Sequence, residues 1–369
     1  MGHTPAARPV GIQHSFADVN GVRLHYASAG GAAPSTAAGA TAGASKLILF
    51  LHGFPEFWYA WKEQLVEFGR DHLAVAPDMR GYNLSSKPAE VERYEIKQLV
   101  GDVRAIVEHL QPGHAGAKKC FLVGHDWGGV VAWAAAIACP EVVEKLVIIN
   151  SPHPGIFQRE LAQNPAQQQA SQYMLLLRSP AAESMLSANN FELWQKAILG
   201  EGLRLGYFSE ADRQAYVEAW SQPGALTGGL NYYRAAKIGP RDAQAGPPIA
   251  QEGSPSATSS APSAESATPT ARAGAPTAKA GPPAGPDQPL TAAGDGGARM
   301  ESNFPSLEVK APTLVIWGEQ DPYLLTGNLN GLERYVPNLR IERIPDGTHW
   351  VVHEKPALVN SLIRSFLES

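Results

Sequence analysis

The sequence predicts an α/β fold, with a mostly parallel central sheet, helices on both of its faces and a helical cap inserted between its strands. The first observation is a set of short runs that are apolar throughout, as strands buried on both faces of a parallel sheet are. The second is that amphipathic helical patterns alternate with these runs, which favours helices packed on both sides of the sheet. The runs are found at residues 47–51, 73–76, 121–123, 146–149 and 314–317.

The elements before and after the first runs follow in order. Between residues 15 and 29, alternating apolar residues flank Asn20-Gly21, the dipeptide that best supplies the positive φ angles of a tight hairpin turn. Residues 30–45 offer almost nothing to bury, so we expect a flexible insertion there. Apolar residues spaced three and four apart predict an amphipathic helix over residues 99–110.

The alternation of strands and helices stops after Asn150. From about residue 154 the pattern is mostly helical and contains no buried-strand run, which indicates an inserted helical cap. It is followed by a stretch of mostly Pro, Ala, Gly and Ser, which cannot offset the entropy of ordering the chain, so we expect disorder. The predicted organisation is a core at residues 14–153 and 304–369, a cap at 154–239 and a disordered linker at 240–303.

Composition and charge point to a small-molecule partner. The net charge of −5 provides no basic surface for nucleic acid or for anionic lipids. Cys120 and Cys139 lie inside apolar runs and suggest no disulfide framework, so we expect a reducing compartment. The first residues lack the apolar stretch of a signal peptide, and no run is long enough to span a membrane. We therefore expect a soluble cytoplasmic protein, a monomer or homodimer, with no metal ion, no cofactor and no membrane anchor.

The segment GHDWGG, residues 124–129, has the form of a nucleophile turn that carries Asp126 in place of the usual serine. It follows the run at 121–123 and precedes an alanine-rich helical stretch, which is the strand–turn–helix context that such an elbow requires. Its glycines allow a sharp turn and a close approach of the helix. The alternative is that Asp126 only caps the helix, as aspartate often does. The bracket of small residues favours a nucleophile.

A nucleophile at such an elbow needs an acid and then a histidine later in the chain. Asp321 follows the run at 314–317, which places it at the carboxyl edge of the sheet, where open α/β sheets bind ligands. His349 follows a further expected strand, residues 340–344, and precedes the last helix. We therefore predict Asp126 as the nucleophile, His349 as the base and Asp321 as the acid that orients the base.

Other polar residues near these positions are predicted to have structural roles. Glu319 ends a strand at the surface, and Asp346 forms a turn beside a glycine. Asn150 ends another strand but is not acidic, so it does not compete for the role of the acid. His353 lies four residues beyond the predicted base and is expected to pack on the last helix. His125 is expected to hold neighbouring groups by hydrogen bonds.

The segment HGFP, residues 52–55, constrains the loop after the first buried run. The Phe54-Pro55 bond is a candidate for the cis form, which X-Pro bonds adopt far more often than others. The backbone N–H groups of Phe54 and Trp127 would then point to one spot and form an oxyanion hole. The alternative is an aromatic turn that only fills the core.

Seven segments, taken in their order, are similar to the epoxide hydrolases of the α/β-hydrolase superfamily, in particular to their vertebrate-type soluble and membrane-anchored branches. The resemblance covers nearly the whole chain outside residues 30–45 and 240–303, and the joint order of the segments is more specific than any one of them. The segments are HGFPEFWYAW, DMRGYNLSSKP, GHDWGGVVAW, NSPHP, SQPGALTGGLNYYRA, WGEQD and GTHW.

The resemblance implies a role for each matching residue. In this family a carboxylate at the elbow, here Asp126, attacks an epoxide carbon. A histidine–acid pair, here His349 with Asp321, then activates the water that hydrolyses the resulting ester. Two tyrosines of the cap protonate the epoxide oxygen, and they match Tyr173 in SQYMLLLRSP and Tyr233 in NYYR.

Two further residues are predicted to contact the substrate. Tyr232 occupies a variable aromatic position beside Tyr233 and is expected to be a pocket wall, and Pro55 belongs to the constrained loop. A cap rich in Leu, Met and Phe indicates an apolar epoxide, which with water completes the expected partners.

Two alternatives stay open at the level of sequence. A haloalkane or haloacid dehalogenase would use the same Asp126, His349 and Asp321. Halide release, however, needs N–H donors rather than phenols, and Phe54 has no side-chain donor. A non-enzymatic protein of the same fold could have lost the triad, yet every member is present. Faster halide release from halogenated alkanes than hydration of epoxides would favour the dehalogenase.

Overall fold

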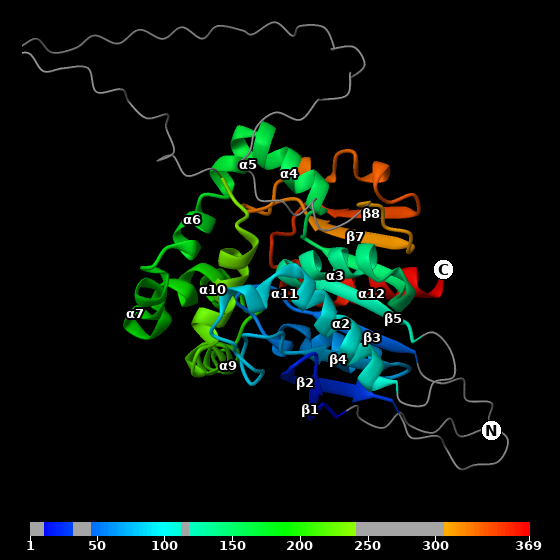
Figure 1. Cartoon of the computed structure of the whole chain (residues 1–369), viewed down its shortest axis with the longest axis horizontal. Coiled ribbons are helices and arrows are strands. Elements are labelled where there is room, and N and C mark those ends of the chain that lie inside the picture. The colour runs from blue at the N-terminus through cyan, green and yellow to red at the C-terminus, as the bar shows by residue number, and fades with distance from the viewer. Residues whose placement is uncertain (1–10, 32–45, 112–117, 241–305) are drawn as a thin grey trace, which may run out of the picture. The chain divides into compact units, whose positions relative to one another are not determined.

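The computed structural model describes residues 11–31, 46–111, 118–240 and 306–369, which contain an eight-stranded sheet (Figure 1). Its strands are β1 (Gln13–Val19), β2 (Val22–Gly30), β3 (Leu47–Leu51), β4 (Leu73–Pro77), β5 (Cys120–His125), β6 (Val143–Ile149), β7 (Thr313–Gly318) and β8 (Leu339–Ile344). They are arranged in the order β1-β2-β4-β3-β5-β6-β7-β8. β2 pairs antiparallel with β1 and β4, and the other pairings are parallel. The predicted mostly parallel sheet is confirmed.

Helices cover both faces of this sheet. Those of the core are α1 (Lys62–Phe68), α2 (Ile96–Leu110), α3 (Trp127–Ala138), α11 (Val351–Glu354) and α12 (Pro356–Glu368). Ile48 and Phe50 of β3 pack with residues of α1, α11 and α12, whereas Leu49 and Leu51 pack with residues of α2 and α3. This division follows because successive side chains of a strand point to opposite faces.

The hairpin between β1 and β2 is confirmed. Its turn residues Asn20 and Gly21 have φ angles of 47° and 71°, the left-handed values that a two-residue turn of this kind requires. Most of the insertion predicted at 30–45 and of the linker predicted at 240–303 lies outside the described residues.

Helices occupy the described chain between β6 and residue 236. They are α4 (Pro154–Gln163), α5 (Pro165–Ala170), α6 (Tyr173–Arg178), α7 (Ala182–Trp194), α8 (Gly200–Leu205), α9 (Glu210–Ser221) and α10 (Ala225–Ala236). Figure 1 shows this cap in shades of green beside the sheet. Shorter helical segments are η1 (Trp58–Trp61), η2 (Val91–Tyr94), η3 (Pro140–Val142), η4 (Gln195–Leu199), η6 (Thr326–Leu329) and η7 (Leu332–Arg334).

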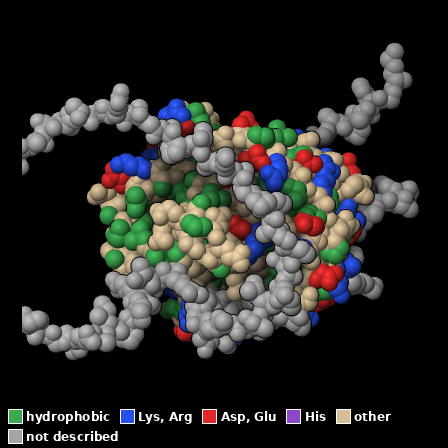
Figure 2. All heavy atoms as spheres, turned by 90° about the horizontal axis from the view of Figure 1, so that it is seen from above, with side chains coloured by type: hydrophobic (Ala, Val, Ile, Leu, Met, Phe, Trp, Pro, Cys, Tyr) green, Lys and Arg blue, Asp and Glu red, His purple; other side chains and the backbone are tan. Residues whose placement is uncertain are grey.

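The surface carries charges of both signs. On the face that Figure 2 presents, acidic and basic side chains are interspersed and do not gather into one basic patch. Within the described ranges, none of the helices is both long enough and apolar enough to cross a membrane.

Candidate active site

Asp126 lies at a strained turn between β5 and α3. Its backbone has a φ of 49° and a ψ of −121°, a conformation that residues other than glycine rarely adopt. A Cβ atom on Gly124 would lie 2.4 Å from the carbonyl oxygen of Gly128, and a Cβ on Gly128 would lie 2.1 Å from that of Leu51. The start of α3 is therefore too close to the sheet for a side chain at either glycine. Asp126 makes no side-chain hydrogen bond to the N-terminus of α3, so it does not act as a helix cap.

The Asp126 carboxylate is held by the loop after β3. Its Oδ1 accepts a hydrogen bond of 2.7 Å from the backbone N–H of Phe54, and a Cβ on Gly53 would lie 2.6 Å from the Asp126 Cβ. The Phe54-Pro55 peptide bond is cis, as predicted. Trp127 is the first residue of α3, so its backbone N–H has no acceptor within the helix. The Phe54 amide thus contacts the carboxylate and the Trp127 amide directly follows Asp126 in the chain, and their joint role as an oxyanion hole stays a prediction.

His349 lies between Asp126 and Asp321. Its Nδ1 is 2.7 Å from Oδ2 of Asp321, and its Nε2 is 3.7 Å from Oδ2 of Asp126. Burial lowers the pKa of His349, but the carboxylates of Asp321, Asp126 and Glu56 outweigh burial and raise this pKa to about 9. Burial raises the pKa of Asp321, but His349, together with the hydrogen bonds from Leu324 and Asn150, outweighs burial and lowers this pKa overall. At neutral pH the pair is therefore an imidazolium beside a carboxylate.

Asn150, at the end of β6, orients the acid. Its Nδ2 donates to Oδ2 of Asp321 over 2.8 Å, and its Oδ1 accepts from the backbone N–H of Gly318 over 2.8 Å. The other oxygen of Asp321 accepts from the backbone N–H groups of Tyr323 and Leu324. Each oxygen of this carboxylate thus has two donors. The sequence analysis did not predict this role for Asn150. The signal that could have indicated it is a side chain with an N–H donor at the end of β6, the strand that pairs with β7.

Glu319 and Asp346, the two other acidic residues near these strand ends and alternatives to Asp321 as the acid, lie just after β7 and in a turn, as predicted. Glu319 pairs with Arg343 over 2.7 Å, and Asp346 pairs with Lys355 over 2.8 Å, both away from His349. Among the described residues, no group of three or more His, Cys, Asp or Glu side chains is arranged to hold a metal ion.

His353, predicted to pack on the last helix, makes a hydrogen bond that the sequence did not indicate. Its Nε2 lies 2.6 Å from Oε1 of Glu56, a buried carboxylate. Glu56 also accepts from the hydroxyl of Tyr216 in α9 over 2.9 Å and lies 3.2 Å from Nδ1 of His125. Burial raises the pKa of Glu56, but His353 and His125 outweigh burial and hold this pKa well below its usual range. The sequence did not single out Glu56, which connects the cap to His125, the residue preceding Asp126.

Tyr173 and Tyr233 pack against each other near Asp126. Their ring centroids are 6.3 Å apart, and the Tyr233 ring also stands edge-on to Phe54 at 5.0 Å and to Trp127 at 5.1 Å. Burial and then the charge of Asp126 raise the pKa of Tyr173 well above its usual range. Burial, Tyr173 and Asp126 do the same for the pKa of Tyr233. Both phenols therefore keep their protons at neutral pH and are available as donors.

The helix that carries Tyr233 docks on the core through two glycines. Gly81, in the loop after β4, has a φ of 90°, and a Cβ on Gly228 of α10 would lie 2.3 Å from the Gly81 carbonyl oxygen. Only a residue without a side chain fits at Gly228 in this contact. The close approach brings α10, and with it Tyr233, down onto the core.

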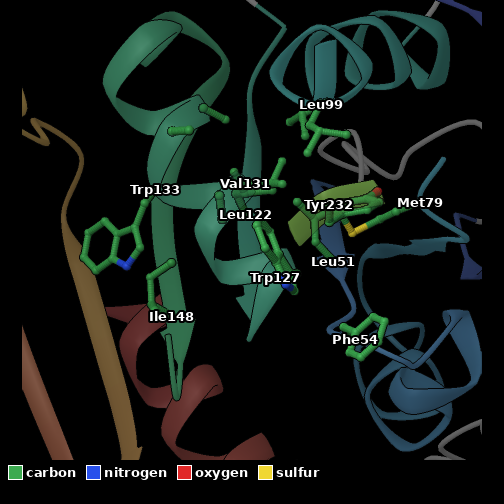
Figure 3. Packing of buried hydrophobic residues seen from close by; sticks show 14 of the residues in the cluster. Leu51, Phe54, Met79, Leu99, Leu122, Trp127, Val131, Trp133, Ile148 and Tyr232 are labelled. Atoms are coloured by element: carbon green, nitrogen blue, oxygen red, sulfur yellow. The ribbon is translucent and has the colours of Figure 1, made fainter. Parts of the chain in front are cut away.

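Tyr232, predicted to be a pocket wall, borders a small internal cavity with Leu51 and Met79, and its contact with a substrate stays a prediction. Its side chain is fully buried, and its hydroxyl donates to the carbonyl oxygen of Arg80 over 2.9 Å. Its ring packs against Tyr82 and Trp127, within the cluster that Figure 3 shows. Neighbouring residues of a helix point about 100° apart. Tyr233 therefore turns toward Asp126, and Tyr232 turns into the core.

Pro55 lies where the core meets the cap. Its carbonyl oxygen accepts a hydrogen bond of 2.7 Å from the indole N–H of Trp220, and it borders a small pocket with Phe54 and Trp194. Contact between Pro55 and a substrate stays a prediction.

Comparisons with known proteins agree with the observed fold. The α/β-hydrolase fold family matches residues 46–356. The chain is 32% identical to the AB hydrolase superfamily protein YfhM of Bacillus subtilis, over 97% of this chain and 99% of that one. It is 31% identical to epoxide hydrolase 4 of Mus musculus, over 95% of this chain and 77% of that one. The crystal structure of a Bacillus megaterium epoxide hydrolase in complex with an inhibitor has 32% identity and a TM-score of 0.71, over 96% of this chain and 100% of that one.

Proposed function

The chain belongs to the epoxide hydrolases of the α/β-hydrolase family, and on that premise we propose that it converts apolar epoxides to vicinal diols through a covalent ester on Asp126. The observation that carries this mechanism is the meeting of three groups: an elbow carboxylate, a buried histidine–acid pair and two protonated phenols of the cap. A carboxylate and a histidine–acid pair would also serve a dehalogenase. The phenols favour an epoxide, because its oxygen needs a proton donor.

Ring opening is the first step. An oxygen of Asp126 bonds to one epoxide carbon while the bond from that carbon to the ring oxygen breaks. The released oxygen is strongly basic and takes a proton from Tyr173 or Tyr233. Attack by a serine would leave an ether that water does not cleave, whereas attack by Asp126 leaves an ester. A carboxylate at the elbow is thus required, because only an ester can be hydrolysed to release the enzyme for another turnover.

Esterification changes the state of His349. The charge of Asp126 is one of the causes that raise the pKa of His349, and this charge disappears when the ester forms. The pKa of His349 therefore falls. The imidazolium then gives its proton to the deprotonated phenol, which restores the phenol and leaves a neutral imidazole. The neutral imidazole can then take a proton from water, whose oxygen attacks the ester carbonyl. The Phe54 and Trp127 amides stabilise the resulting oxyanion. When the oxyanion collapses, the bond between the carbonyl carbon and the substrate's ester oxygen breaks and the Asp126 carboxylate forms again. The released oxygen takes the remaining proton of the water and becomes the second hydroxyl of the diol.

This change predicts two different pH dependences for one side chain. In the free enzyme His349 should titrate near pH 9, with the imidazolium present below that value. Ester decay needs the neutral imidazole, so its rate should rise with pH and reach its plateau below pH 9, because the raising effect of Asp126 is lost while that of Asp321 remains. The measurement is an NMR titration of His349 compared with single-turnover rates of ester decay across pH. A plateau reached only above the pH at which the free enzyme titrates would contradict the proposed change.

The covalent ester is tested by a single turnover in heavy-oxygen water with enzyme in excess. The first diol should carry ordinary oxygen from the Asp126 carboxylate, and the heavy isotope should appear in the protein. Digestion and mass spectrometry of the peptide that contains Asp126 locate the label. Heavy oxygen in the first diol would show that water attacks the epoxide directly and would refute the ester.

A further inference from the structure

A buried amide of the cap, Gln167 in α5, binds two separate parts of the site. Its Nε2 donates to the carbonyl oxygen of Tyr323 over 2.7 Å and to Oγ of Ser171 over 3.0 Å. Its Oε1 accepts from the backbone N–H of Leu325 over 3.0 Å and from Nδ2 of Asn328 over 2.8 Å. An amide has two N–H donors and two acceptor positions. All four are used here, so the orientation of this side chain is fully specified.

The partners of Gln167 belong to two segments that each carry a residue of the proposed reaction. Tyr323 and Leu325 belong to the loop that contains Asp321, residues 319–325, and Ser171 lies in the turn just before Tyr173. The loop has no strand or helix between the end of β7 and the start of η6, so its position depends on bonds such as these. One side chain thus sets the spacing between the acid loop and the helix of the ring-opening phenol.

Tyr323 continues this connection to the reacting residues. Its backbone N–H donates to Oδ1 of Asp321 over 2.8 Å. Its ring is perpendicular to that of His349, with centroids 5.5 Å apart, and packs edge-on to that of Tyr173 at 5.3 Å. Edge-to-face pairs at such distances are favourable arrangements of aromatic rings. Tyr323 therefore contacts the acid, the base and one of the proton donors.

We propose, resting on the function proposed above, that Gln167 and Tyr323 form one positioning unit for the site. The unit holds Tyr173 and the Asp321–His349 pair at a fixed separation, so that one alignment of the cap serves both ring opening and ester hydrolysis. Such alignment matters because displacements of roughly 0.5 Å reduce catalysis. Gln167 and Tyr323 act through their neighbours, as positioning residues.

The test measures ester formation and ester decay separately in single turnovers of the full-length enzyme. Tyr323→Leu keeps the backbone bonds but removes both ring contacts, and it should lower both rates by about tenfold, since two ring pairs are lost. Tyr323→Phe keeps the ring and should restore both rates. Gln167→Met fills the same space without hydrogen bonds and should also slow both steps.

Matched controls separate positioning from general destabilisation. Tyr26 is a half-buried tyrosine of β2, and Gln64 is a buried glutamine of α1 whose amide donates to Asn360 of α12. Tyr26→Leu and Gln64→Met should lower the melting temperature but leave both rates unchanged. Wild-type rates in Tyr323→Leu, or losses in the controls as large as in their counterparts, would overturn the positioning unit.

Titration of His349 in the absence of substrate tests the positioning unit separately from the proposed function. In Tyr323→Leu and Gln167→Met, the looser bond between His349 and Asp321 should lower the pKa of His349 from about 9 toward its ordinary value. An unchanged titration in both variants would refute the positioning unit even if the wild type forms the ester. Absence of the ester in the wild type would refute the proposed mechanism, while the titration would still decide on the unit.

Discussion

Replacing His349 with glutamine is expected to stop the enzyme after its first chemical step. Glutamine can still donate a hydrogen bond to Asp321, but it cannot take a proton from water, so the ester on Asp126 should persist. Turnover should fall by about 10⁴-fold or more, as for other enzymes that lose their general base. Intact-protein mass spectrometry after mixing with an epoxide should show an increase equal to the mass of that epoxide.

The control for this variant is an exposed histidine. His109 lies near the end of α2, away from the sheet edge that carries Asp126 and Asp321, and His109→Gln should turn over at the normal rate without an adduct. Normal turnover by His349→Gln would exclude His349 as the base. Loss of turnover with no adduct, in a variant that is folded, would place His349 in ring opening rather than in hydrolysis.

The second large effect is expected from removing both phenols of the cap. Tyr173→Phe combined with Tyr233→Phe should slow ester formation by roughly 10²- to 10⁴-fold, because the oxygen released from the ring loses its proton donors. Each single variant should lose less, since the other phenol still donates. Rapid quenching followed by measurement of the esterified enzyme gives the rate of this step directly.

The adjacent tyrosine provides the matched control. Tyr232→Phe removes a hydroxyl that bonds the carbonyl oxygen of Arg80 in the core. It should cost about 1 kcal/mol in the free energy of unfolding and leave the rate of ester formation unchanged. If Tyr232→Phe slowed ester formation as much as Tyr233→Phe, the two tyrosines would not have the separate roles that their orientations indicate. An unaffected rate in the double variant would refute the donor role of the phenols.

Local sequence patterns were sufficient for the scaffold. The apolar run at residues 47–51 is a strand buried on both faces, and the turn at Asn20-Gly21 is a hairpin, because each of these features depends on residues close together in the chain. The elbow at Asp126 was equally readable, since the small residues that permit it stand within four positions. The order of elbow, acid and histidine then indicated Asp321 and His349, and the resemblance to a family indicated which tyrosines to expect.

Residues that support the site from a distance were not readable in this way. Glu56 bonds His353 across 297 positions of sequence, and Gln167 bonds Tyr323 across 156. Neither pair has a spacing or a composition that marks it. Which residues they bond depends on which loops the cap helices cover in the folded protein.

By itself, then, the sequence determined the parallel sheet and the carboxylate elbow, and it predicted Asp321 and His349 as the acid and the histidine that follow it. Only the tertiary structure decided that Tyr233 faces Asp126 while Tyr232 is buried, and that Asn150 holds Asp321. The physical reason is that hydrophobic periodicity specifies which face of an element is buried but not against which partner. That choice depends on close packing of shapes, such as Gly228 against the core, and it involves residues far apart in the chain.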